Sequence, residues 1–273
     1  MGAKTTGSDQ PDIDTTTPHS ARVYDYLLGG STNFEPDRIA AQQQAAAFGG
    51  LDAARAAIRA NRVFLGQVVR YLAGPAGVRQ FLDIGTGIPG DDNVHAVAQQ
   101  IAPDARIAYV DNDPIVLAHA HQLLAPGGTT SFVLSDFNDP ADVIQQAGDT
   151  LDFDQPVALL LIALLHHFPD DASPYAKVAE LVDALPSGSY LALSHMASDI
   201  DPETMSALED SVPESAQYRF AMRSRGEVTS FFDGLDLVDP GVVRVDEWQP
   251  ADLDPPDEKA VPAHHWGGVA RKP

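Results

Sequence analysis

The chain has 273 residues, of which 44% are hydrophobic and none is cysteine, so a sizeable core is possible while disulfides, thiolate catalysis and cysteine-ligated zinc are excluded. Asp and Glu number 39 against 17 Lys and Arg. The resulting net charge of −22 disfavours nucleic acid and anionic membrane surfaces as partners.

The first residues of the chain are polar and lack periodicity. Residues 1–17 are rich in Thr, Asp, Gly and Pro, and we expect them to form a disordered tail. They contain no apolar stretch next to basic residues, as a secretory signal would, and no apolar run approaches the ~20 residues that span a bilayer. We therefore expect a cytoplasmic protein that does not enter the membrane.

Helical patterns fill the chain from residue 18 to residue 74. Two short helices, one containing ARVYDYLL and one over residues 35–48, are separated by Gly29 and Gly30. A longer amphipathic helix is expected over residues 52–72, with Asp52 as its N-cap. These helices predict a cap on a single core domain over residues 75–273.

After Gly74 and Pro75, strand and helix patterns alternate, as is typical of a parallel sheet covered on both faces. The continuous apolar run over residues 156–165 predicts a buried central strand. The other expected strands are residues 80–84, 106–111, 130–134 and 189–195, and the expected helices are residues 93–101, 114–124 and 175–185.

The C-terminal part of the chain shows a different pattern. Helices are expected over residues 202–218 and 227–232. Alternating residues at 235–238, 242–248 and 266–271 predict closing strands, with a long Asp- and Pro-rich loop before the last one. An antiparallel ending on an otherwise parallel sheet is therefore expected.

A Gly-rich turn follows the first expected strand, in the segment LDIGTGIPG at residues 82–90. Gly85, Thr86 and Gly87 lie between a strand and a helix, where a GxGxxG pattern commonly binds a dinucleotide. Asp83, however, lies at the end of that strand, where its charge opposes a pyrophosphate and favours a cation. Pro89 and the acidic pair Asp91 and Asp92 also suit a phosphate badly. S-adenosylmethionine carries an ammonium and a sulfonium and no phosphate, so the turn favours it over NAD.

Acidic residues follow the second and third expected strands as well. Asp111, before Asn112, is the expected ligand of ribose hydroxyls, and Asp113 before Pro114 is the expected N-cap of the next helix. Asp136 and Phe137, after the third strand, are expected to contact an adenine ring. Acidic residues at the carboxyl ends of three expected strands indicate an adenosine site, because open α/β sheets bind ligands at the carboxyl ends of their strands.

These motifs resemble those of the class I S-adenosylmethionine-dependent methyltransferases. Residues 83–87 resemble their first motif, Asp111 their ribose acid and the segment ALLHHF, beginning at Ala163, the stretch after their fourth strand. The segments ARVYDYLLGG, QFLDIGTGIPG and GSYLALSH further resemble a largely uncharacterised bacterial S-adenosyl methyltransferase family. The resemblance implies a Rossmann-like α/β three-layer sandwich, with a mostly parallel seven-stranded sheet, a C-terminal antiparallel hairpin and an N-terminal helical lid. It also implies S-adenosyl-L-methionine as cofactor.

Residues of the first helix are expected to close the cofactor site. In the lid interpretation, Tyr24 or Tyr26 covers the cofactor and Arg22 or Arg62 pairs with its carboxylate. In the other interpretation, the helix only packs and its aromatic rings belong to the core.

Several histidines are candidates for proton transfer. His166, His195 and Tyr24 are the expected catalytic residues if the acceptor must lose a proton. His166 and His167 also remain possible as metal ligands or as a structural pair, although neighbours on a strand would point to opposite faces. No metal is expected, and His264 and His265 are expected to be solvated in a loop.

The sequence thus predicts a methyltransferase that acts on an unidentified small-molecule acceptor. Two alternatives remain open: an NAD-dependent oxidoreductase, which shares the Gly-rich turn and the ribose acid, and a protein that binds the cofactor without turnover. The oligomeric state is not predicted.

Overall fold

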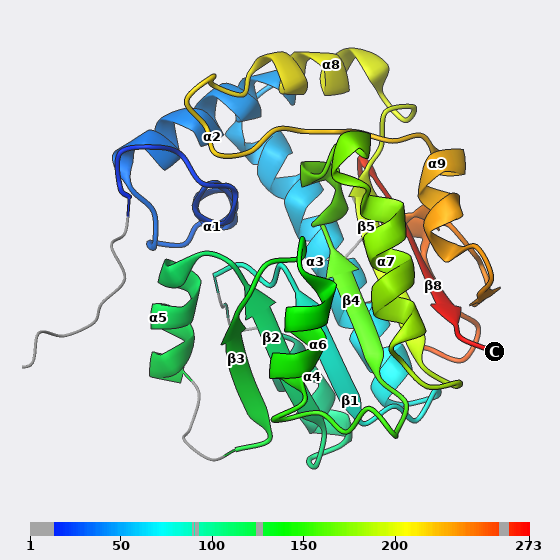
Figure 1. Cartoon of the computed structure of the whole chain (residues 1–273). Helices are drawn as coiled ribbons and strands as arrows, with labels where there is room; N and C mark the ends of the chain where they lie inside the picture. Colours follow the sequence, from blue (N-terminus) through cyan, green and yellow to red (C-terminus); the bar gives the residue numbers. More distant parts are fainter. Residues whose placement is uncertain (1–13, 89, 91–92, 124–127, 257–261) are drawn as a thin grey trace, which may run out of the picture.

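The computed structural model describes residues 14–88, 90, 93–123, 128–256 and 262–273. A central sheet of eight strands has helices on both faces, and further helices lie over the carboxyl ends of its parallel strands (Figure 1). The strand order is β3-β2-β1-β4-β5-β8-β6, with β7 also paired to β8. The first five strands run parallel, as expected: β1 Gln80–Ile84, β2 Arg106–Asp111, β3 Thr130–Leu134, β4 Ala158–Ile162 and β5 Tyr190–Met196.

The C-terminal strand β8 (His265–Arg271) runs antiparallel to β5 over its whole length. On its other side it pairs with two short strands, β6 (Asp236–Leu237) and β7 (Val243–Arg244). A turn between them, closed by a 2.8 Å hydrogen bond from Gly241 N to Val238 O, interrupts this edge of the sheet. The sheet therefore has eight strands where seven were expected.

Alternating side chains of the strands build two cores. In β4, Leu160 packs toward α3 (Leu51–Ala73) and α4 (Val94–Ile101), while Leu159 packs toward the opposite face. That second face is covered by α6 (Pro140–Ala147), α7 (Pro174–Asp183) and η3 (Ser230–Phe232). Helix α5 (Pro114–Leu123) contacts the outer strands β2 and β3. Burial on both faces explains the continuous apolar sequence of the central strand.

The cap lies over the carboxyl ends of the parallel strands (Figure 1). It contains α1 (Ser20–Leu28), α2 (Glu35–Ala47) and the first part of α3, whose remainder continues along the sheet. Helix α8 (Pro202–Asp210) packs on α2 and completes the cap. The expected N-terminal lid is therefore built from two distant parts of the chain.

Part of the expected tail is held in place. Residues 1–13 lie outside the described residues. The guanidinium of Arg22, however, donates hydrogen bonds to the carbonyl oxygens of Asp14 (2.7 Å) and Thr17 (2.8 Å). A buried arginine thus binds the backbone at Asp14 and Thr17, the part of the expected tail nearest to α1.

Several element boundaries differ from those expected. The helix over residues 202–218 ends at Asp210, and Pro213 follows shortly after. The central strand ends at Ile162, because Ala163 adopts a positive φ of 54° and η1 (Leu165–His167) begins soon afterwards. Gly50, and not Asp52, is the N-cap of α3. Helix α6 was not predicted, although Asp139 caps it by accepting from Asp142 N.

Candidate active site

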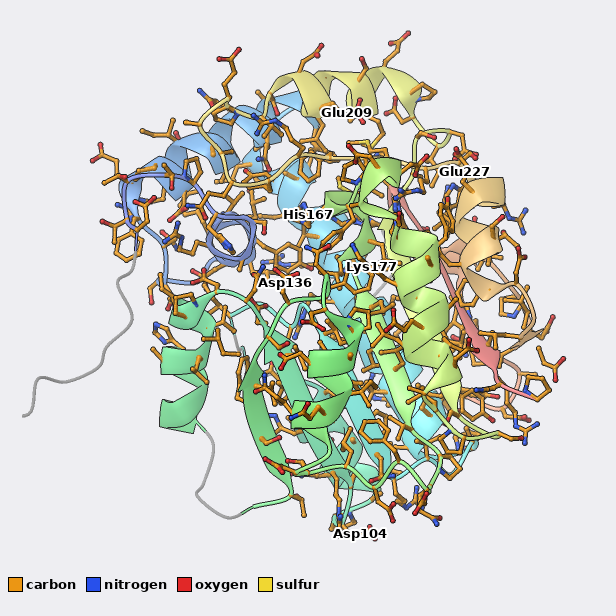
Figure 2. All side chains as sticks on the ribbon, in the orientation of Figure 1. Asp104, Asp136, His167, Lys177, Glu209 and Glu227 are labelled. Carbon is orange, nitrogen blue, oxygen red and sulfur yellow. The ribbon has the colours of Figure 1, made fainter. Side chains whose placement is uncertain are left out.

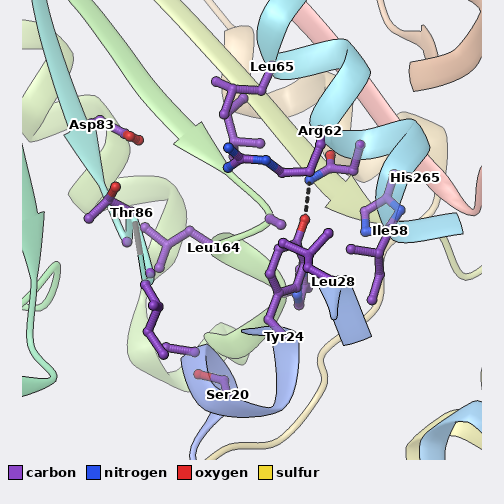
Figure 3. A pocket seen from close by; sticks show the side chains of 18 of the residues that line it. Ser20, Tyr24, Leu28, Ile58, Arg62, Leu65, Asp83, Thr86, Leu164 and His265 are labelled. Carbon is purple, nitrogen blue, oxygen red and sulfur yellow. Dashed lines mark hydrogen bonds between the residues drawn. The ribbon is translucent and has the colours of Figure 1, made fainter. Parts of the chain in front are cut away.

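A cavity of about 1600 Å³ separates the cap from the carboxyl ends of the strands. Figure 3 shows Ser20, Tyr24 and Leu28 of α1 facing Thr86 and Leu164 of the core across it. In Figure 2, Asp136 and His167 lie near this boundary, whereas Asp104 lies at the opposite end of the sheet. The expected adenosine residues and the cap thus border one space.

The Gly-rich turn passes directly from β1 into this cavity. Gly85 and Gly87 adopt positive φ angles of 72° and 66°, which favour glycine. A Cβ on Gly85 would also lie 2.5 Å from Leu164 Cδ1. The backbone N–H of Gly87 donates to the Asp111 carboxylate at 2.8 Å, so the turn is tied to the end of β2.

Asp111 is buried and binds backbone groups on two sides. Besides Gly87 N, its carboxylate accepts a hydrogen bond from Asp113 N at 2.9 Å. Asp113 in turn accepts from Ile115 N at 2.9 Å, which confirms it as the N-cap of α5. Burial raises the pKa of Asp111, and the neighbouring charge of Asp113 adds to this increase.

Asp83 lies at the end of β1 and is 6% exposed. Burial raises its pKa to about 7, against the opposing effects of the Thr86 hydrogen bond and the positive charge of Arg62. Figure 3 shows Arg62 reaching from α3 into the space beside Asp83. Two buried acids with raised pKa values favour a cationic ligand, which would stabilise their ionised forms.

The residues after β3 form a small polar cluster at the cavity. Asn112 Nδ2 donates to Asp136 Oδ2 at 2.9 Å, and Asn138 N donates to Asp136 Oδ1 at 2.7 Å. Phe137 is 3% exposed and packs against Phe168 at a centroid distance of 4.7 Å. All of the expected adenine residues line the cavity, while Phe137 also belongs to the core. Pro89, Asp91 and Asp92 lie outside the described residues.

A chain of hydrogen bonds joins the end of β4 to the cap. Ala163 N donates to Ser194 Oγ at 3.0 Å, and that hydroxyl donates to Asn61 Oδ1 at 2.6 Å. Asn61 Nδ2 then lies 3.5 Å from the Tyr24 hydroxyl, the contact marked in Figure 3. Ala163 and Tyr24, both predicted site residues, are therefore linked through α3.

The other two predicted cap residues do not border the cavity. Arg22 is 2% exposed and pairs with Asp37 at 3.3 Å, in addition to its bonds to residues 14 and 17. The Tyr26 hydroxyl accepts from Gln42 Nε2 at 3.3 Å. Of the two arginines considered for the cofactor carboxylate, Arg62 lines the cavity and Arg22 does not. This placement does not support the roles expected of Arg22 and Tyr26.

Four histidines gather where η1 meets the ends of β5 and β8. The ring of His166 lies 4.4 Å from that of His167, 5.7 Å from His195 and 6.1 Å from His265, measured between centroids. His166 and His167 lie on a 3-10 helix, so the expectation that they point to opposite faces of a strand is wrong. Among the described residues, no group of His, Asp and Glu is arranged to hold a metal ion.

His195 is fully buried, and both of its ring nitrogens are bonded. Nδ1 donates to Met196 O at 2.8 Å, and Nε2 accepts from Arg223 at 2.9 Å. Burial lowers its pKa to about 3, and it does not line the cavity. The structure therefore does not support the catalytic role expected of His195. His166 and Tyr24 do line the cavity.

Arg223 organises this region and was not anticipated. It is 3% exposed and, besides His195, binds Leu165 O at 3.3 Å, Phe168 O at 3.0 Å and Asp170 at 2.7 Å. These bonds fix η1, and with it His166. Because Arg223 lies far along the chain from η1, no local pattern could reveal the contact.

The environment of His265 also differs from the expected one. It begins β8, is 6% exposed and lines the cavity, whereas a solvated loop position was expected. Burial lowers its pKa to about 4. The environment of His265 is set by the pairing of β8 with β5, and not by the Pro-rich sequence before β8.

The chain is similar to known proteins in both sequence and structure. A sequence model of the family described as S-adenosyl methyltransferase matches residues 6–273. A DUF574 family protein from Streptomyces avermitilis is 40% identical, with 96% of this chain and 100% of that chain covered and a TM-score of 0.88. A Thermobifida fusca protein, provisionally assigned as a methyltransferase, is 36% identical over 98% of this chain and 99% of its own, with a TM-score of 0.85.

A more distant structure shares the fold alone. Human N-acetylserotonin methyltransferase, solved with S-adenosylmethionine, is 14% identical over 92% of this chain and 59% of its own, with a TM-score of 0.50. A search of curated sequences gives no significant match.

Proposed function

The chain belongs to the S-adenosyl methyltransferase family, and on this premise we propose that it methylates a small-molecule acceptor bound beneath the cap. The family and the fold make it an S-adenosylmethionine-dependent methyltransferase of the Rossmann-like class. The observation that carries the proposal is the continuity of the cavity, which is lined by the strand-end acids on one side and by the cap and histidines on the other. Its volume of about 1600 Å³ exceeds the roughly 300–1000 Å³ of a typical ligand site, leaving room for cofactor and acceptor together.

The residues at the strand ends fit S-adenosylmethionine by their chemistry. Asp83 and Asp111 are buried acids whose raised pKa values favour a cation nearby. The described residues of the turn, 85–88 and 90, include no basic side chain that would attract a pyrophosphate. The family result gives no support to an NAD-dependent oxidoreductase.

We assign the cofactor contacts by position along the cavity. Asp111 would hold the ribose hydroxyls, and Asp136, Asn112 and Phe137 would border the adenine. The turn and the end of β4 would meet the methionine part, with Arg62 replacing Arg22 as partner of its carboxylate. The proposed contacts of that part are Asp83, Gly85, Thr86, Gly87, Ala163 and Arg62.

Bound S-adenosylmethionine supplies a methyl group on a positively charged sulfur and leaves as S-adenosylhomocysteine. The protein's own contribution is to align the acceptor and exclude water. Tyr24, held by Asn61 of α3, would cover the cavity from the side of α1. His166 would accept the acceptor's proton where one must be lost, because it lines the cavity and its lowered pKa keeps the ring unprotonated before the reaction.

The charge of the whole protein supports a small acceptor. A net charge of −22 repels polyanions, so we propose that nucleic acid is not a substrate. None of the helices in the described part of the chain is both long and apolar enough to cross a membrane. We further propose that residues 18–74 act as the cap of a single methyltransferase domain, together with α8.

Calorimetry would test the cofactor site directly. S-adenosylmethionine and S-adenosylhomocysteine should bind with micromolar affinity, NAD should not bind, and Asp111→Ala should abolish the signal. Binding of NAD alone would overturn the proposal. A protein that binds the cofactor without turnover would pass this test but form no S-adenosylhomocysteine with any acceptor, as followed by mass spectrometry.

A further inference from the structure

Two buried imidazoles in the wall of the cavity have a nitrogen without a partner. Nδ1 of His166 and Nδ1 of His265 are both inaccessible to solvent and form no hydrogen bond within the described part of the chain. Both residues line the cavity, and they are 4% and 6% exposed. Their ring centroids are 6.1 Å apart. Figure 3 shows His265 beside Ile58.

Unpaired polar atoms of this kind require an explanation. Buried polar groups in native proteins are nearly always hydrogen-bonded, because an unsatisfied one loses its hydration without compensation. The two other histidines of the cluster follow this rule, since His195 bonds Met196 and Arg223 and His167 Nδ1 lies 3.3 Å from Arg219 O. Within this cluster of four histidines, the unpaired nitrogens thus belong to His166 and His265.

The surroundings of these rings are aromatic and apolar. Phe220 lies 5.8 Å from His166 and 5.5 Å from His167, and Tyr218 lies 5.7 Å from both His167 and Phe220. Phe48 and Phe220 pack against a buried cluster that contains Met196 and Leu208, and all four residues line the cavity. We call these residues the histidine–aromatic pocket: Phe48, His166, His167, Met196, Leu208, Tyr218, Phe220 and His265.

The pocket itself carries no charge near neutral pH. Burial lowers the pKa of His167 and of His265 to about 4, and it lowers that of His166 as well. The nearby Arg223 is already paired with Asp170 and with two carbonyl oxygens. Asp25, which lines the cavity from α1, accepts from Asn33 Nδ2 at 2.8 Å. A charged ligand would therefore lose its hydration here without gaining a free counter-ion.

We propose that the histidine–aromatic pocket binds the methyl acceptor, and that the acceptor is an uncharged aromatic molecule with an O–H or N–H group. Its ring would pack among Phe220, Tyr218 and Phe48, where aromatic contacts add to apolar burial. Its polar hydrogen would be shared with a neutral imidazole of His166 or His265, whose ring would turn the unpaired nitrogen toward the bound molecule. This inference rests on the proposed function, because the pocket opens into the same cavity as the cofactor site.

The test uses the full chain saturated with S-adenosylhomocysteine and a set of matched probes, titrated by calorimetry at pH 7.5. 1-Naphthol and 1-naphthylamine are neutral donors, and they separate an O–H from an N–H acceptor. 1-Methoxynaphthalene keeps the ring without a donor, 1-naphthoate is an anion and 1-naphthylmethylamine is a cation. We expect one of the neutral donors to bind about tenfold more tightly than the other three probes, as one well-placed hydrogen bond allows.

Variants then locate the bound probe. His166→Phe and His265→Phe keep a ring but remove the nitrogens, and at least one should weaken the neutral donor about tenfold, while His166→Gln should restore part of the affinity. His264→Phe is the control, because His264 neighbours His265 but does not line the cavity. Unchanged affinity for S-adenosylhomocysteine shows that each variant is folded.

The outcomes separate the two proposals. Failure to bind S-adenosylhomocysteine would refute the proposed function, and this inference with it. Three outcomes would overturn this inference alone, provided that S-adenosylhomocysteine still binds normally. No probe binds, or the anion or cation binds more tightly than the neutral donors. In the third outcome, wild type, His166→Phe and His265→Phe bind the neutral donor equally well.

Discussion

Asp111 Oδ2 accepts a hydrogen bond from the backbone N–H of Gly87 at 2.8 Å, while its other oxygen accepts from Asp113 N at 2.9 Å. One carboxylate thus fixes both the Gly-rich turn and the start of α5. The residue that we propose to hold the ribose also shapes the backbone around it.

Replacing Asp111 should therefore affect binding and stability together. In Asp111→Ala two backbone N–H groups lose their acceptor, so we expect the free energy of unfolding to fall by roughly 1–3 kcal/mol. Asp111→Asn keeps one oxygen and should lose less. Urea denaturation measures the stability, and calorimetry with S-adenosylhomocysteine measures the binding. Asp104→Ala, at the opposite end of the sheet in Figure 2, should change neither, and a stable, fully binding Asp111→Ala would contradict the assignment.

The raised pKa of Asp83 predicts a conflict between stability and binding. The unfolded carboxyl has its ordinary pKa of 3.8, whereas burial raises the folded value to about 7. The folded protein therefore holds this proton more tightly, and the unliganded protein loses stability as the pH rises from about 4 to 7. Asp83→Asn removes this loss.

We expect Asp83→Asn to be more stable than wild type at pH 8, by roughly 4 kcal/mol, and to differ little at pH 4. Its affinity for S-adenosylmethionine should be lower, because the carboxylate near the cation is gone. Urea denaturation at the two pH values is the measurement, with Asp104→Asn as control. An equal stability difference at both pH values would show that Asp83 does not titrate as stated.

The two glycines of the turn should respond differently to alanine. At Gly87 only the positive φ opposes a side chain, since no atom of the described residues lies within 4 Å of the added Cβ, and we expect a loss of roughly 1 kcal/mol. At Gly85 the Cβ also meets Leu164 Cδ1 at 2.5 Å, so we expect roughly 2–4 kcal/mol. Adding Leu164→Ala should recover part of the loss in Gly85→Ala and none in Gly87→Ala. Urea denaturation of the four variants checks this, and equal losses for the two glycines would refute it.

Arg22 and Arg62 should show opposite effects. Arg22→Met leaves Asp37, which has no exposed surface, without its ion pair, so we expect a loss of stability of roughly 3 kcal/mol with little change in cofactor affinity once folded. Arg62→Met should instead weaken S-adenosylhomocysteine binding. Thermal denaturation measures the stability of both variants, and calorimetry measures their affinity for S-adenosylhomocysteine. Each variant then serves as the control for the other. Weaker binding in Arg22→Met alone would restore the original expectation.

Local sequence patterns are enough to locate the parts of the site that depend on a short stretch of chain. A strand passes into a turn at Asp83 and Asp111 and at the two glycines. Such positions can be identified from the apolar pattern of the strand and from the turn residues that follow it. The parallel direction of strands β1 to β5 follows from the alternation of strand and helix patterns along the chain. The family resemblance then adds the cofactor.

Residues whose environment comes from distant segments could be placed only once the folded chain was known. On α1, both Arg22 and Tyr24 suit a lid, but packing against Asp37 buries the first and the contact with Asn61 turns the second toward the cavity. His265 was expected in solvent, yet the pairing of β8 with β5 buries it beside His166. Burial and ion pairing depend on contacts between residues far apart in the chain, and local patterns do not encode those contacts.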